Sequence, residues 1–140
     1  MLILDTDHVV EYQKGGSPEA QRLKARLDEA IEPYGTTIIT VEEIMRGWLA
    51  AIRRTGDPFR QINAYSKLRL LFRTFATWNV FDWTTAAAAE FAALKRARTR
   101  GGTMDLKIAS IAISNDATLL SRNLRDFENI PGLRVADWLS

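Results

Sequence analysis

Short apolar runs alternate along this chain with longer segments in which apolar residues recur every three or four positions. The short runs are typical of buried strands, and the longer segments are typical of amphipathic helices. We predict strands over residues 2–4, 36–40, 80–81, 117–120 and 133–135. We predict helices over residues 7–13, 17–30, 40–55, 57–76, 84–98 and 104–115. This alternation is typical of an α/β protein with a small, mostly parallel central sheet flanked by helices.

Capping residues mark the predicted starts of several helices. Ser17 is followed by proline and then glutamate, which are favoured at the first position and in the first turn of a helix. Thr40 is followed three residues later by Glu43, so this stretch matches a capping box. The capping box predicts that the second strand ends at Thr40. Asp7 and Thr103 are expected to cap helices in a similar way.

The size and composition of the chain narrow the classes of protein to consider. It has 140 residues, of which 46% are hydrophobic and 26% charged, so we expect one globular domain over residues 1–140. The absence of cysteine excludes disulfides and thiolate metal sites, and a single histidine, His8, excludes a histidine-rich zinc site. Carboxylates interrupt the N-terminal apolar run, and no run approaches the roughly 20 residues that span a bilayer. We therefore expect a cytoplasmic protein with no membrane partner.

The net charge of +2 conceals an uneven distribution along the chain. Residues 1–45 contain four Lys or Arg and nine Asp or Glu, whereas residues 46–140 contain fifteen and eight. An acidic site inside a basic rim would have this composition, and it would suit a metal ion that faces a polyanion. Two differently solvated surfaces, one acidic and one basic, would give the same distribution of charge along the chain without any site.

Acidic and amide side chains follow the predicted strands at their carboxyl ends, where sites form in open parallel sheets. Asp5 follows the first strand, Glu43 lies in the helix after the second, and Asn123 and Asp126 follow the fourth. Asp105 instead precedes its strand, so its convergence with the others is an assumption. Carboxylates gathered at one point repel each other, and a divalent cation relieves that repulsion. Ligation by oxygen alone fits Mg²⁺ or Mn²⁺.

Each of these residues also has a purely structural explanation. Asp5 can end a strand and begin a turn, Glu43 can serve only the capping box, and Asp105 can be favoured by the helix macrodipole alone. Asp7 is expected to be a cap, and His8 is expected to be a hydrogen-bonded residue rather than a ligand. The grouping of the acids, rather than any one of them, therefore supports a metal site.

The opening DTDHV stretch resembles the first motif of haloacid-dehalogenase-like phosphatases. That resemblance implies Asp5 as a nucleophile, Asp7 as the general acid or base, and Thr40 as the hydroxyl that ends the second strand. Those enzymes also close their Mg²⁺ site with a pair of acids after a later strand. Here Asp57 begins a predicted helix and Gln61 stands where the second acid is required, so this alternative explains less of the chain.

Four stretches, in order, are LILDTDHVV, ITVEEIMRG, GTMDLKIASIAISNDATLLSRN and RDFENIPGLRVADW. Together they span the chain and resemble the PIN-domain ribonucleases, in particular the VapC-type toxins of bacterial and archaeal toxin–antitoxin systems. The resemblance implies a PIN-like three-layer sandwich, and it assigns the family's first three acids to Asp5, Glu43 and Asp105. Many members have a fourth acid where this chain has Asn123. Others have Asn there and an acid three residues later, as Asp126 is here.

The resemblance also implies an activity and partners. The activity is metal-dependent hydrolysis of tRNA or rRNA that leaves 5′-phosphate and 3′-hydroxyl ends. Asp5, Glu43 and Asp105 would hold Mg²⁺ or Mn²⁺, with Asn123 and Asp126 as further ligands. The implied partners are a small antitoxin of the VapB type and a second copy of the chain. A non-catalytic interaction module, in which the acids are structural, is the remaining alternative.

Two further groups of residues are expected to support such a site. Thr6 and Thr40 can orient the ligands, or they can simply satisfy backbone groups at strand ends. A cationic cluster just before Asp105, with one residue after the fourth strand, is expected to bind RNA phosphates without reading sequence. These cations are Lys95, Arg96, Arg98, Arg100 and Arg122.

Overall fold

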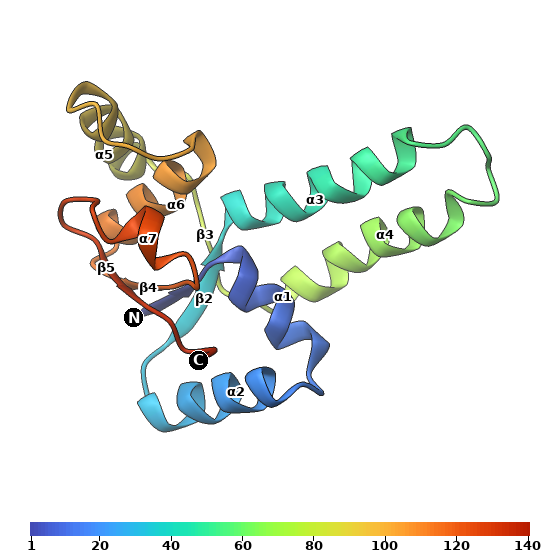
Figure 1. The fold of residues 1–140 in the computed structure, drawn as a ribbon, viewed down its shortest axis with the longest axis horizontal. Coiled ribbons are helices and arrows are strands. Elements are labelled where there is room, and N and C mark those ends of the chain that lie inside the picture. Colours follow the sequence, from blue (N-terminus) through green and yellow to red (C-terminus); the bar gives the residue numbers. More distant parts are fainter.

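The structure, a computed structural model, describes residues 1–140 and contains one sheet of five parallel strands in the order β3-β2-β1-β4-β5. The strands are β1 (Leu2–Leu4), β2 (Tyr34–Thr37), β3 (Val80–Phe81), β4 (Thr118–Leu120) and β5 (Arg134–Ala136). The helices are α1 (Thr6–Lys14), α2 (Pro18–Ala30), α3 (Ile38–Arg53), α4 (Ile62–Ala76), α5 (Thr85–Arg96), α6 (Thr103–Ser114) and α7 (Leu124–Phe127). Figure 1 shows α3 and α4 as a hairpin that projects from the sheet, with α2 and α5 on opposite sides of the molecule.

Different helices cover the two faces of the sheet, because successive residues of a strand point to opposite faces. Ile3 and Leu119 pack in one buried cluster with residues of α5, α6 and α7. Leu2, Leu4 and Leu120 pack in a second cluster with residues of α1, α2 and the end of the chain. The fold is therefore the predicted α/β three-layer sandwich, and its sheet is parallel throughout.

The second strand ends earlier than predicted, and the helix after it begins earlier. β2 ends at Thr37 and α3 begins at Ile38, so Thr40 lies in a helical turn and does not end a strand. The Thr37 hydroxyl accepts the backbone N–H of Thr40 at 3.1 Å and caps α3. Ile39 is buried in the core as a helical residue, despite its β-branched side chain. The predicted capping box is therefore wrong, and Glu43 lies in the second turn of α3.

Other helix starts also differ from the predicted ones. Asp5, rather than Asp7, is the N-cap of α1. Asp57 accepts the backbone N–H of Phe59 at 3.0 Å in a turn, so α4 begins later than predicted, at Ile62. Thr103 is the first residue of α6 rather than its cap. The short helix α7 was not predicted, while the boundaries of α2, β3 and α5 agree closely with expectation.

The hairpin of α3 and α4 exposes large apolar side chains along its length. Phe59, Ile62 and Phe72 are 80%, 59% and 68% exposed, so these residues do not belong to the core. None of the helices combines the length and the apolar composition needed to cross a membrane.

Candidate functional site

Asp5 stands at the carboxyl end of β1, the middle strand of the sheet. Its Oδ1 accepts the backbone N–H of Thr6 at 2.8 Å, and its Oδ2 accepts the hydroxyl of Ser121 at 2.7 Å. Only 7% of the residue is exposed. Burial raises the pKa of Asp5 to about 6, with further contributions from the charges of Asp7 and Asp105, although the two hydrogen bonds oppose the shift.

Glu43 approaches the same place from the second turn of α3. The Thr6 hydroxyl donates to Glu43 Oε1 at 3.3 Å, and it also lies 3.2 Å from the buried hydroxyl of Thr40. Burial raises the pKa of Glu43, and the charges of Asp5 and Asp105 raise it further. Thr6 and Thr40, the two predicted supporting residues, therefore lie beside the acids.

Asp105 lies in the first turn of α6. This helix leads through a short turn to the amino end of β4, so it runs against the strand direction and its first turn returns to the carboxyl edge. Burial raises the pKa of Asp105, and the charges of Asp126 and Asp7 raise it further. The charge of Asp105 in turn raises the pKa of Asp5 and of Glu43. The three predicted acids thus lie near enough to affect one another.

The segment after β4 brings Asn123 and Asp126 to the same edge of the sheet. Asn123 Nδ2 donates to Asp126 Oδ2 at 2.8 Å, so the two side chains are paired. Asp126 is exposed in the first turn of α7, and its charge acts on Asp105. This pair therefore borders the three acids on the side of Asp105.

Two residues at the site have roles that the sequence did not reveal. Ser121 is fully buried between β4 and α7, where it donates to Asp5 and accepts the backbone N–H of Asn123 at 3.0 Å. Asp7 is not a cap, because its Oδ2 accepts the backbone N–H of Arg122 at 3.0 Å. The available signal for Ser121 was its position two residues before Asn123, in the S-x-N arrangement of the quoted stretch.

The chemistry of the donor set determines which ion the site fits. All the candidate ligands are oxygen atoms, and burial raises the pKa of three of the carboxylates, so a hard divalent cation would stabilise their charged forms. No group of three or more His, Asp and Glu side chains is placed closely enough to hold one ion directly. In ligand type and charge, the residues fit Mg²⁺ or Mn²⁺.

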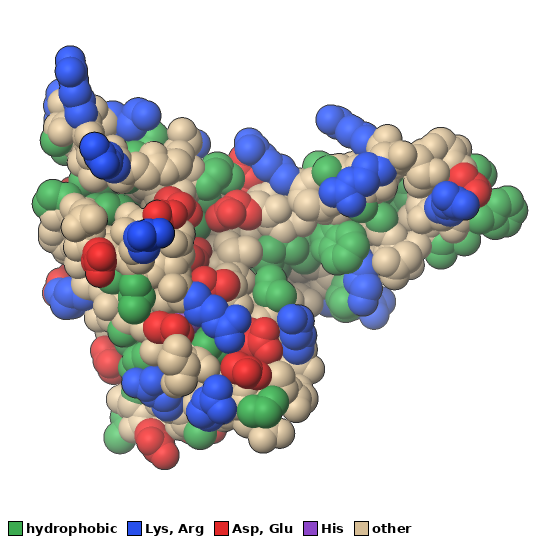
Figure 2. Space-filling view, in the orientation of Figure 1, with side chains coloured by type: hydrophobic (Ala, Val, Ile, Leu, Met, Phe, Trp, Pro, Cys, Tyr) green, Lys and Arg blue, Asp and Glu red, His purple; other side chains and the backbone are tan.

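Cationic side chains surround these acids. Lys95 and Arg96 end α5, Arg98 and Arg100 lie in the loop before α6, and Arg122 follows β4, all of them exposed. In Figure 2, Asp and Glu side chains gather between α7 and the start of α3, while Lys and Arg stand out from the α5 end and along the α3–α4 hairpin. The acids thus have exposed cations on neighbouring elements, which agrees with the first of the two explanations that the uneven charge distribution left open.

The fold and site together define a small α/β protein that gathers the buried Asp5 and the half-buried Glu43 and Asp105 at the carboxyl edge of a parallel sheet. A sequence model of the PIN domain family matches residues 2–133, so the chain belongs to the PIN-domain family, as predicted. The phosphatase alternative is not favoured. Thr40 does not end a strand, and Asp57 lies between α3 and α4 rather than after a strand.

Comparison with individual proteins identifies VapC proteins as similar. The chain is 38% identical over 63 residues to the tRNA(fMet)-specific endonuclease VapC of Salmonella typhimurium. That match covers 42% of this chain and 48% of the relative, so it spans about half of the relative's length. DNA-bound VapBC from Salmonella typhimurium has a similar structure, with a TM-score of 0.70, 27% identity and coverage of 98% and 97% of the two chains. VapBC-1 from nontypeable Haemophilus influenzae shares the fold, with a TM-score of 0.71, 21% identity and coverage of 99% and 98%.

Proposed function

We propose that this protein is a cytoplasmic, metal-dependent endoribonuclease that cuts tRNA or rRNA and acts as the toxin of a VapBC-type pair. The observation that carries the proposal is the cluster of the buried Asp5 with the half-buried Glu43 and Asp105, in which the charge of Asp105 raises the pKa of the other two acids. Membership of the PIN-domain family supports it. The partial identity to a tRNA(fMet)-specific endonuclease supports RNA as the substrate.

The three acids would hold Mg²⁺ or Mn²⁺, directly or through water, and the pair of Asn123 and Asp126 would complete the ligand set. When bound, such an ion lowers the pKa of a water molecule and offsets the charge that develops on the phosphate. Thr6 and Ser121 hold both oxygens of Asp5, and the Thr6 hydroxyl holds Glu43. These hydrogen bonds fix the carboxylates in orientation before the ion arrives.

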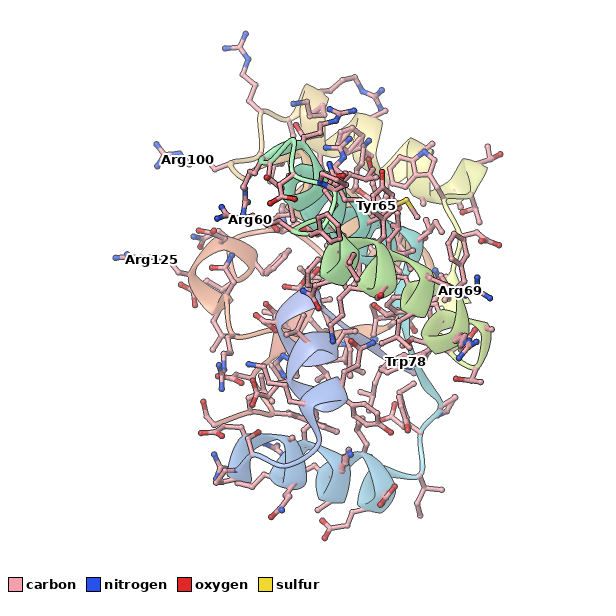
Figure 3. The ribbon with its side chains drawn as sticks, turned by 90° about the vertical axis from the view of Figure 1, so that its right-hand side faces the viewer. Arg60, Tyr65, Arg69, Trp78, Arg100 and Arg125 are labelled. Carbon is pink, nitrogen blue, oxygen red and sulfur yellow. The ribbon has the colours of Figure 1, made fainter.

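The cations would bind the phosphates of the RNA on either side of the cut. Figure 3 shows Arg100 and Arg125 projecting outward on the same side of the molecule, one from the loop before α6 and the other from α7. Arg125 therefore joins the cations predicted from the sequence, which are Lys95, Arg96, Arg98, Arg100 and Arg122. Contacts of this kind position the backbone and carry no base specificity.

The proposed protein partners would bind to the exposed apolar surface of the α3–α4 hairpin. Phe59, Ile62 and Phe72 are exposed on this projecting element, where a partner would cover them. Related structures of VapBC complexes support a VapB-type antitoxin as one partner, and a homodimer is the other proposed assembly.

Cleavage of RNA by the purified protein tests the proposal. Total tRNA and a structured rRNA fragment are incubated with the protein in Mg²⁺, in Mn²⁺ or in EDTA. Asp5→Asn and Asp105→Asn are compared with wild type, and Glu29→Gln, at an exposed acid on α2, is the matched control. We expect discrete cuts with 5′-phosphate ends that require metal, vanish in both Asn variants and persist in the control.

Two outcomes would contradict the proposal. Cuts that persist in EDTA, or that both folded Asn variants make at the wild-type rate, would show that the acids do not carry the activity. A non-catalytic interaction module predicts no metal-dependent cleavage and full tolerance of Asp5→Asn.

A further inference from the structure

The last residues of the chain, 137–140, form a strap that is docked against α1 and α2. Leu139 is only 1% exposed and belongs to the core cluster on this side of the sheet. Arg22 donates to the backbone carbonyl of Leu139 at 3.1 Å, and the Arg26 guanidinium lies 4.6 Å from the centre of the Trp138 ring. The strap is therefore fixed to two helices by packing, a hydrogen bond and a cation–π contact.

His8 connects this strap to α1 from a fully buried position. Its Nε2 lies 3.2 Å from the backbone nitrogen of Trp138 and accepts that N–H. The proton of the neutral ring is therefore on Nδ1, which donates to Asp7 Oδ1 at 2.6 Å. Both ring nitrogens thus have partners, one in the strap and one beside the acidic site.

Asp7 continues the connection to the segment that touches Asp5. Its other oxygen, Oδ2, accepts the backbone N–H of Arg122 at 3.0 Å and lies 3.4 Å from the Ser121 hydroxyl. Ser121 donates to Asp5, and the backbone N–H of Asn123 donates to Ser121. A continuous series of hydrogen bonds therefore runs from the strap, through His8 and Asp7, to segment 121–123 and the first acid.

Capping does not account for this arrangement. Asp5 already caps α1, and both oxygens of Asp7 are used by groups outside that helix's backbone. The contacts join residues that are 115 and 130 positions apart in the chain. A side chain that fixes the hydrogen-bond partner of a metal ligand also fixes the orientation of that ligand.

We infer that Asp7 and His8 are positioning residues: His8 holds Asp7, and Asp7 holds segment 121–123 against Asp5, while the same histidine ring docks the C-terminal strap. The inference rests on the proposed function for its catalytic consequence. Of the two contacts that His8 makes, the one to Asp7 is required at the site, and the one to Trp138 is required by the strap. The two can be removed separately.

Two isosteric variants separate these contacts. The amide nitrogen of Asn reaches about as far from the backbone as Nδ1 of histidine, and the amide oxygen of Gln reaches about as far as Nε2. His8→Asn therefore retains a donor to Asp7 and loses the acceptor for Trp138. His8→Gln retains the acceptor for Trp138 and loses the donor to Asp7. Both variants keep a neutral side chain in the same buried position.

The experiment measures Mn²⁺ binding by calorimetry, RNA cleavage, and amide hydrogen exchange of Arg122 and Trp138 by NMR. For His8→Gln we expect about tenfold weaker Mn²⁺ binding, a similar loss of kcat and faster exchange of the Arg122 amide. For His8→Asn we expect near wild-type Mn²⁺ binding and faster exchange of the Trp138 amide alone. Equal effects of the two variants on Mn²⁺ binding, or none from His8→Gln, would overturn the inference.

Amide exchange also separates this inference from the proposed function. If wild type neither binds Mn²⁺ nor cuts RNA, the proposed function fails, while the Arg122 amide still reports whether His8→Gln loosens the segment. Asp7→Asn provides a second variant in case His8→Gln does not fold. Asparagine has one acceptor oxygen, whereas the two oxygens of Asp7 accept from His8 Nδ1 and from the Arg122 N–H. The Arg122 amide should therefore exchange faster in this variant. Unchanged exchange would overturn the inference.

Discussion

Asp5→Asn should stabilise the metal-free protein while it abolishes cleavage. The pKa of Asp5 is raised from 3.8 to about 6, chiefly because burial disfavours the charged carboxylate. A shift of about two pKa units corresponds to about 3 kcal/mol of cost for ionising this group in the folded state. Asparagine removes the charge but remains a good N-cap for α1, so most of this cost should disappear in the variant.

The pH dependence gives this prediction a definite sign. Because the pKa of Asp5 is higher in the folded state, the folded protein binds more protons than the unfolded chain between pH 3.8 and about 6. The stability of wild type therefore falls as the pH rises through this interval, and levels off above it. The advantage of Asp5→Asn should be near zero at the acidic end and reach about 3 kcal/mol at neutral pH, as an upper limit.

Urea unfolding in EDTA, measured by circular dichroism at several pH values, provides the assay. Added Mg²⁺ should then stabilise wild type and leave Asp5→Asn unchanged, because binding to the folded state alone raises stability. Glu29→Gln, at an exposed position on α2, should change neither result. A variant that is less stable than wild type at neutral pH, or an advantage independent of pH, would refute the reasoning.

Three further changes test separate features of the structure. Ser121→Ala removes the donor to Asp5 Oδ2 and should weaken Mn²⁺ binding about tenfold in calorimetry. Thr37→Ala removes the cap of α3 and should lower the free energy of unfolding in urea by about 1 kcal/mol. Glutamine at four exposed cations should weaken RNA binding and reduce the slope of log affinity against log salt by up to about three. These four cations are Lys95, Arg96, Arg98 and Arg100. An unchanged affinity, stability or salt slope would contradict the corresponding prediction.

The sequence predicts the sheet well because its strands are short apolar runs with clear boundaries. The run before Asp5 is one example, since an apolar strand that ends in a carboxylate places that acid at the carboxyl edge. The start of α3 is harder, because two threonines three residues apart can each serve as a helix cap. The hydroxyl of Thr37 caps α3 at the backbone N–H of Thr40 in the structure, whereas only Thr40 has a glutamate three residues later in the sequence. Burial of Ile39 as a helical residue decides between them, and local propensity carries no information on that burial.

The candidate site shows the same division between local and long-range information. The convergence of Asp105 with the other acids is an assumption at the level of sequence, because this residue precedes its strand, yet the topology is sufficient to place it. A helix that leads into the amino end of a parallel strand has its own first turn at the carboxyl edge. The roles of Ser121 and Asp7 depend instead on hydrogen bonds between residues more than a hundred positions apart, and no local pattern specifies them.

The most direct test of the proposed site compares two neighbouring acids on α3. Glu43 lies beside Thr6 and the other acids, whereas Glu42 forms an ion pair with Arg46, one turn later on the same helix, at 2.6 Å. The measurement is the rate of Mg²⁺-dependent RNA cleavage by Glu43→Gln and by Glu42→Gln, each shown to be folded. We predict that Glu43→Gln loses cleavage and Mn²⁺ binding, and that Glu42→Gln keeps both. Equal activity of the two variants would contradict the assignment of Glu43, with Asp5 and Asp105, to one metal-binding active site.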